Sequence, residues 1–102
     1  MRLPIQTVIS AVLLLYPPAA PAQTAPMPHF LLACAACHGF DGIGYNDSTP
    51  NLAGQHRQYL YNQLIAFRSG QRRHPQMSFF SVQMSQDELQ QIVDYFSALP
   101  AR

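Results

Sequence analysis

Two cysteines three positions apart, followed at once by a histidine, constrain this 102-residue chain more than any other feature. Cys34 and Cys37 lie about one helical turn apart, so a short helix would present both thiols on one side. Each thiol can add to one vinyl group of a haem, and His38 can then ligate the iron. The stretch Cys34-Ala35-Ala36-Cys37-His38 therefore predicts one covalently attached haem c per chain.

Three other roles for the two cysteines fit the sequence less well. A structural zinc site needs four ligands, and the chain has neither a second Cys-x-x-Cys pair nor a His-x-x-x-His pair. A thioredoxin-type redox pair requires a βαβ setting, whereas this sequence shows almost no strand periodicity. A plain disulfide between Cys34 and Cys37 remains the alternative that needs no cofactor.

The N-terminal segment, residues 1–22, has the pattern of a secretory signal peptide. Arg2 supplies a positive start, residues 8–16 form an apolar run, and Ala20-Pro21-Ala22 resembles a small-x-small cleavage site. The apolar run falls well short of the ~20 residues that span a bilayer. An uncleaved amphipathic anchor or a buried helix is the alternative, but prolines at positions 4, 17 and 18 disfavour a long helix.

Cleavage near Ala22 would leave one domain over residues 23–102, with an extended lead-in over residues 23–28. Haem attachment and oxidised thiols both belong outside the cytosol, so we expect this domain in the periplasm. We expect no insertion of the mature chain into the membrane.

The charge of this domain limits its partners. Without Arg2 the chain has five arginines against five acidic residues, a formal charge of zero, and it contains no lysine. A strongly basic face for nucleic acid or anionic lipid is therefore not available. We expect redox proteins as partners and no nucleic acid.

The sequence predicts helices at both ends of this domain and in its middle. The first would start near Pro28 and run into the cysteines. The second would cover about residues 56–69, with its apolar face at Leu60, Leu64 and Phe67 and its end at Gly70.

The last helix would cover about residues 86–98 and stop before Pro100. Ser85 and Glu88 fit a capping box at its start. Its buried stripe would consist of Leu89, Ile92, Val93, Phe96 and Leu99.

The two segments between the predicted helices, residues 39–50 and 71–84, differ in composition. Residues 39–50 contain three glycines, which predicts a loop that packs against a flat surface. Residues 71–76 form a polar, basic connection, and residues 77–84 are apolar enough to fold over a buried surface.

The second axial position on the iron decides what a haem protein does. A thioether there favours the ferrous form and suits electron transfer, whereas an open site suits gas binding or peroxide chemistry. The candidates after His38 are Met77, Met84, His56 and His74. The ordinary alternative for either methionine is a pliable filler of the core.

Further residues carry a resemblance to a known family. They are the Cys34–Gly39 motif, Asp41-Gly42, Pro50-Asn51-Leu52-Ala53-Gly54-Gln55, Tyr59-Leu60, Gln63-Leu64, Phe67, Gly70, Arg72, Met77, Ser85 and Tyr95-Phe96. Through them the chain resembles a small bacterial class I cytochrome c, most closely one half of the di-haem cytochromes of the c4 group. The resemblance covers residues 32–99.

This resemblance implies an all-α class I cytochrome c fold, with three to four helices wrapped around one haem. It implies that His38 and Met77 are the axial iron ligands, with Met84 the next candidate. It also implies that the Pro50 carbonyl accepts the proton on the other ring nitrogen of His38. Arg72 would be a partner for a haem propionate.

The expected function is that of a periplasmic mono-haem electron carrier without catalytic residues. The alternative is a haem-bearing electron-transfer subunit of a larger oxidoreductase. A third reading is an open-iron, gas-binding haem protein.

Overall fold

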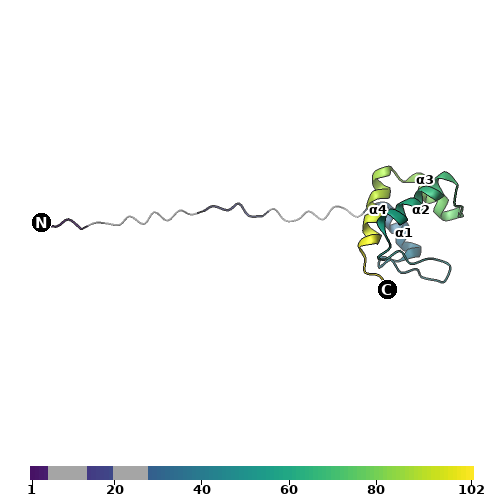
Figure 1. Cartoon of the computed structure of the whole chain (residues 1–102), viewed down its shortest axis with the longest axis horizontal. Coiled ribbons are helices and arrows are strands. Elements are labelled where there is room, and N and C mark those ends of the chain that lie inside the picture. Colours follow the sequence, from purple (N-terminus) through teal and green to yellow (C-terminus); the bar gives the residue numbers. More distant parts are fainter. Residues whose placement is uncertain (5–13, 20–27) are drawn as a thin grey trace.

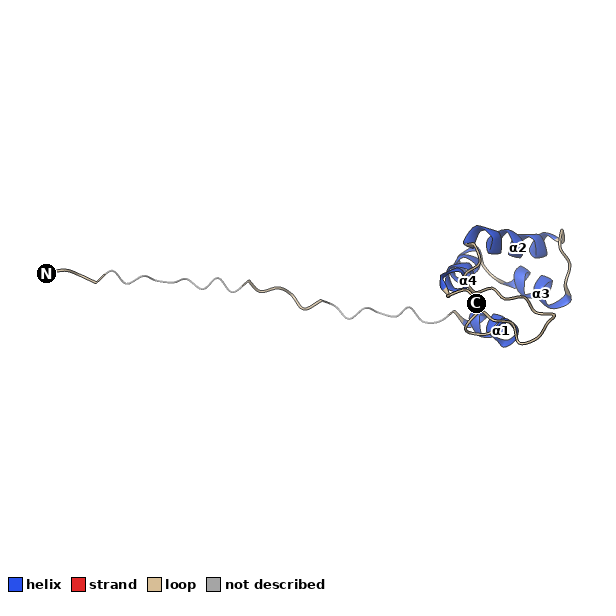
Figure 2. Ribbon diagram, turned by 60° about the horizontal axis from the view of Figure 1, so that its bottom comes forward, coloured by secondary structure: helices blue, strands red, loops and turns tan. Residues whose placement is uncertain are grey.

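The computed structural model of this chain describes residues 1–4, 14–19 and 28–102. These residues contain four helices and no strand: α1 (His29–His38), α2 (Arg57–Ser69), α3 (Pro75–Gln83) and α4 (Gln86–Ala98). Figure 1 shows α4 beside α1 and α2, and Figure 2 shows all four helices gathered together. The prediction of an all-α fold with three to four helices is confirmed.

Two parts of the predicted signal peptide, residues 5–13 and the cleavage site at residues 20–22, lie outside the described residues. The same holds for residues 23–27 of the predicted lead-in. Among the described residues, no helix has the length and apolarity that a bilayer crossing requires.

The last helix, α4, begins and ends where its sequence signals predict. The Ser85 side chain accepts a hydrogen bond from the Glu88 backbone N–H at 3.2 Å, and Glu88 Oε1 accepts one from the Ser85 N–H at 3.2 Å. This capping box satisfies two backbone donors and contributes about 1 kcal/mol. The predicted stripe is buried at Leu89, Ile92, Val93 and Phe96, and partly buried at Leu99.

The second helix, α2, starts one residue later than predicted, because His56 has an extended backbone and is its N-cap. The helix ends at Gly70, whose φ of 80° is the left-handed conformation that glycine adopts most readily. Leu60, Leu64 and Phe67 are its buried residues, as predicted.

The third helix, α3, was not predicted as a helix. The apolar residues of α3 do not form one buried face: Phe79 and Val82 are exposed, Phe80 lines the cavity, and Ser81 is the one fully buried residue of this helix. The helix is instead defined at its start, where Pro75 takes the first helical position and His74 is the N-cap.

One hydrophobic core joins α1, α2 and α4. Its fully buried members are Leu31, Leu60, Leu64, Met84, Leu89, Ile92, Val93 and Phe96. The helix α1 contributes Leu31 to this core, and Ala35 is also completely buried. This packing holds α1, which carries the cysteines, against α4.

Residues 39–56, between α1 and α2, are fastened to α4 near both ends. The Tyr95 hydroxyl donates a hydrogen bond to the Phe40 carbonyl, and the Gly54 N–H donates one to the Phe96 carbonyl at 3.1 Å. Within the loop, the Gly42 carbonyl accepts from the N–H groups of Leu52 and Ala53. The predicted loop is thus an ordered segment with defined anchors.

Candidate functional site

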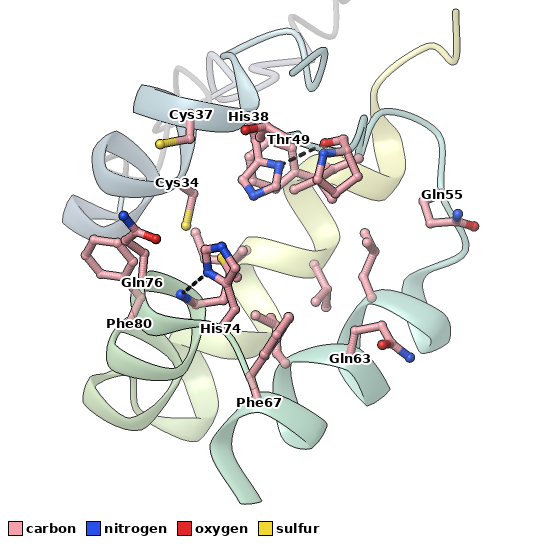
Figure 3. Close-up of a pocket in the computed structure, with 18 of the residues that line it drawn as sticks. Cys34, Cys37, His38, Thr49, Gln55, Gln63, Phe67, His74, Gln76 and Phe80 are labelled. Atoms are coloured by element: carbon pink, nitrogen blue, oxygen red, sulfur yellow. Dashed lines mark hydrogen bonds between the residues drawn. The ribbon is translucent and has the colours of Figure 1, made fainter. Parts of the chain in front are cut away.

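A cavity of about 600 Å³ opens between the four helices and residues 46–55 of the loop. This volume is within the range of small-molecule and cofactor sites. Apolar side chains form much of the lining, among them Leu52, Leu60, Leu64, Phe67 and Met77. Figure 3 shows α1 on one side of this cavity and α2 and α3 on the other.

Both cysteines belong to α1 and line the cavity. Cys34 is half-buried and Cys37 exposed, and the structure contains no disulfide between them. Burial raises the pKa of the Cys34 thiol to about 11. A redox-active cysteine needs a lowered pKa, because the thiolate is the nucleophile. The environment of Cys34 therefore argues against a thioredoxin-type pair.

His38, the last residue of α1, is 7% exposed and lines the same cavity. Its Nδ1 lies 2.9 Å from the Pro50 carbonyl oxygen. A carbonyl only accepts hydrogen bonds, so Nδ1 must carry the proton and Nε2 of the neutral ring keeps its lone pair. This arrangement orients the ring and leaves one nitrogen able to bind a metal.

The two methionines on the cavity wall differ in their surroundings. Met84 is 2% exposed and belongs to the hydrophobic core. Met77 is only partly buried and lies in the first turn of α3. The side chain of Met77 is therefore less enclosed by the core than that of Met84 and more available to a ligand in the cavity.

The predicted histidine candidates separate into two groups. His74 lines the cavity, and its Nδ1 accepts a hydrogen bond from the Met77 N–H at 3.3 Å. His56 is the N-cap of α2 and does not line the cavity. The structure thus brings His38, His74, Met77 and Met84 to one cavity and leaves His56 outside it.

Arg72 lies at the edge of the cavity and is held in place by α2. Its Nη1 donates a hydrogen bond to Gln63 Oε1 at 2.7 Å, and its guanidinium lies 4.7 Å from the centre of the Phe67 ring. Its neighbour Arg73 lines the cavity as well. Two guanidinium groups at one rim provide binding partners for a carboxylate of a bound molecule.

The residues of this cavity fit a covalently attached haem. They supply two thiols on one helix, an imidazole with a free Nε2, a thioether in reach of the same space, and an apolar lining. Within the described residues no group of three or more His, Cys, Asp or Glu side chains could hold a metal ion. The zinc alternative therefore finds no site in this part of the chain.

Two features of the site were missed from the sequence. Phe80 lines the cavity from α3, and His74 caps that helix through the Met77 N–H. The signal was present in the pair His74-Pro75, because a polar residue followed by proline is typical of a helix start.

Comparison with known proteins matches residues 21–96 to the family described as "Cytochrome C oxidase, cbb3-type, subunit III". The chain is 45% identical over 67 residues to the thiosulfate dehydrogenase electron acceptor of Stutzerimonas stutzeri (strain A1501), covering 63% of this chain and 31% of that protein. It is 35% identical over 68 residues to cytochrome c-554(548) of Halomonas halodenitrificans, covering 64% of this chain and 82% of that protein.

Among solved structures, the chain is similar to reduced recombinant cytochrome c4 from Pseudomonas stutzeri. The TM-score is 0.59 at 32% identity, and the match covers 65% of this chain and 37% of that chain. The chain spans about a third of the length of the thiosulfate dehydrogenase electron acceptors that it matches, 31% in S. stutzeri and 38% in Thiomonas intermedia (strain K12).

Proposed function

This chain belongs to the c-type cytochromes, and on that premise we propose that it carries single electrons between protein partners in the periplasm. Members of this family hold haem c covalently, and Cys34, Cys37 and His38 fit their attachment motif. The observation that carries the proposal is the hydrogen bond between His38 Nδ1 and the Pro50 carbonyl, which leaves Nε2 free in a residue that lines the same cavity as both cysteines.

Haem c supplies a one-electron couple at its iron, whose potential depends on the axial ligands, burial and hydrogen bonding. The remaining functions belong to side chains of this protein. Cys34 and Cys37 would hold the haem through two thioether bonds, and His38 Nε2 would bind its iron. The Pro50 carbonyl fixes the ring plane of His38 and raises its donor strength.

Met77 would supply the second protein ligand to the iron in this proposal. Both methionines line the cavity, but the partial burial of Met77 supports this assignment over Met84, which is a fully buried member of the core. Thioether ligation raises the reduction potential and suits electron transfer. Arg72 binds a propionate, supported by its fixed place at the cavity edge beside Gln63.

Electrons leave and enter at the exposed edge of the cavity near Cys37. The mature chain is neither strongly basic nor strongly acidic. Electrostatic attraction therefore contributes little to the rate at which it associates with its partners. Contacts of this kind are small and short-lived. We include in the proposal that residues 1–22 are a signal peptide cleaved near Ala22, which would deliver the chain to the periplasm.

A second candidate function is that of an electron-transfer subunit bound permanently to a larger oxidoreductase. Large apolar side chains exposed on α1 and α3, Leu32 at 59% and Phe79 at 58%, favour it, since such residues can cover a permanent interface. Purification from the native host separates the two candidates. A free carrier elutes alone, whereas a subunit elutes with a large partner.

The test of the proposed function is an optical spectrum of the protein produced in a host that attaches haem. We expect a c-type spectrum in the reduced form and, in the ferric form, the far-red band of sulfur ligation. Ferrous protein should not bind carbon monoxide readily. A colourless, folded protein with a Cys34–Cys37 disulfide would contradict the proposal, and ready binding of carbon monoxide would favour the open-iron alternative.

A further inference from the structure

The start of α3 joins a cavity residue to the backbone of the proposed axial ligand. His74 is the N-cap of this helix, and its ring accepts a hydrogen bond from the N–H of Met77 at 3.3 Å. We propose that His74 is a positioning residue for Met77, holding the first turn of α3 in the conformation that presents the sulfur to the iron. This inference rests on the proposed function, because it takes Met77 as the axial ligand.

The contact belongs to a reciprocal arrangement. The His74 N–H donates to Ser78 Oγ at 3.3 Å, and the Ser78 N–H donates to the His74 carbonyl at 2.8 Å. Pro75 has no N–H and fixes its own φ, so it fits the first helical position. The ring of His74 thus satisfies one of the few N–H groups that the start of α3 leaves unpaired.

The side chain of Met77 is flexible and only partly packed, so the position of its sulfur depends on where its backbone is held. Methionine is unbranched and has three rotatable side-chain bonds, so its own stiffness does little to place the sulfur. Met77 is also only partly buried, so packing restrains it less than Met84. The cap of α3 therefore fixes the backbone position from which this weakly packed side chain extends.

Loss of this restraint would weaken Met77 as a ligand without removing it. A free ligand that competes with Met77 for the iron would then bind more tightly. Its apparent affinity would rise by the same factor by which the equilibrium constant for Met77 binding to the iron falls. Typical N-cap losses correspond to about a five- to thirtyfold change in such an equilibrium.

The experiment is a titration of the ferric holoprotein with imidazole, followed through the far-red band. His74→Ala should lower the apparent dissociation constant of imidazole by about five- to thirtyfold. His74→Asn should restore a value near that of wild type, because asparagine is among the best N-caps. Ser85→Ala is the matched control: it removes the cap of α4, outside the cavity lining, and should leave imidazole binding unchanged.

The outcomes distinguish this inference from the proposed function. Equal imidazole affinities for wild type and His74→Ala would overturn the inference alone, as would a His74→Asn variant that behaves like His74→Ala. A comparable change in Ser85→Ala would also overturn it, because the effect would then be general destabilisation. A wild-type ferric spectrum without the far-red band would instead overturn the assignment of Met77 as ligand.

Discussion

His38 and Pro50 are twelve residues apart in the chain, yet His38 Nδ1 lies 2.9 Å from the Pro50 carbonyl oxygen. The contact joins the end of α1 to the loop before α2, so the orientation of the proposed iron ligand depends on the path of that loop. Both partners lie at the cavity wall. The loop is therefore part of the site and not only a connection.

The two methionines should respond in opposite ways to truncation. Met77→Ala should remove the far-red band of the ferric protein and allow the ferrous protein to bind carbon monoxide. Met84→Ala should leave both spectra unchanged but lower the free energy of unfolding by about 2–5 kcal/mol, because its side chain fills the core. Spectra and denaturant titrations check both expectations, and the reverse pattern would assign the ligand to Met84.

The loop that orients His38 should not accept a side chain at Gly44. A Cβ there would lie 2.0 Å from the Thr49 carbonyl oxygen, next to Pro50. We expect Gly44→Ala to lower the free energy of unfolding by about 1–3 kcal/mol and to shift the reduction potential, because Pro50 must move.

Gly70→Ala is the control for that variant. A Cβ at Gly70 meets nothing within 4 Å, but its φ of 80° costs an alanine about 1–2 kcal/mol. Stability should therefore fall while the potential stays the same. A Gly44→Ala protein with an unchanged potential would show that the loop does not control the iron.

Loss of both thiols should abolish the fold as well as the colour. The Cys34→Ala, Cys37→Ala double variant has no sulfur to hold the haem, and a domain of about eighty residues with an unfilled apolar cavity is only marginally stable. Far-ultraviolet circular dichroism should show a loss of helix. Single variants, which keep one thioether, should retain part of it. A cooperatively folded, colourless double variant would mean that the cavity has no need of haem.

Electron transfer to a protein partner should depend only weakly on salt. The chain has a formal charge of +1, which would fall to zero on the proposed cleavage near Ala22, whereas steering by strong charges changes association rates by about 10- to 1,000-fold. We expect the second-order rate constant to change by less than about tenfold between low and physiological ionic strength. Stopped-flow measurements over a salt series check this, and a steep fall would reveal a charged docking face.

The parts of the fold that sequence predicted are those with local causes. The ends of α4 follow from Ser85, Glu88 and Pro100, which act within a few residues of the helix ends. The end of α2 follows in the same way from the backbone of Gly70. The placement of Cys34 and Cys37 on one helix beside the cavity, on which the proposed attachment depends, is also local, because their spacing determines it.

Features that depend on distant contacts could not be read from periodicity. The helix α3 lacks a single apolar face, since its side chains line a cavity on one side and meet solvent on others. The pairing of His38 with Pro50 came from the family resemblance alone, because no local rule links positions twelve residues apart. The capping of α3 by His74 was accessible in principle through the proline that follows it.

The fastening of the loop to α4 bears on the order in which this protein is assembled. Phe40 precedes Tyr95 by fifty-five residues, so this contact joins distant parts of the chain and forms only when the domain folds. Before the domain folds, Cys34 and Cys37 lie on an open chain. We expect the machinery that joins porphyrin to sulfur to act on this open chain, with the finished cavity forming afterwards around its contents.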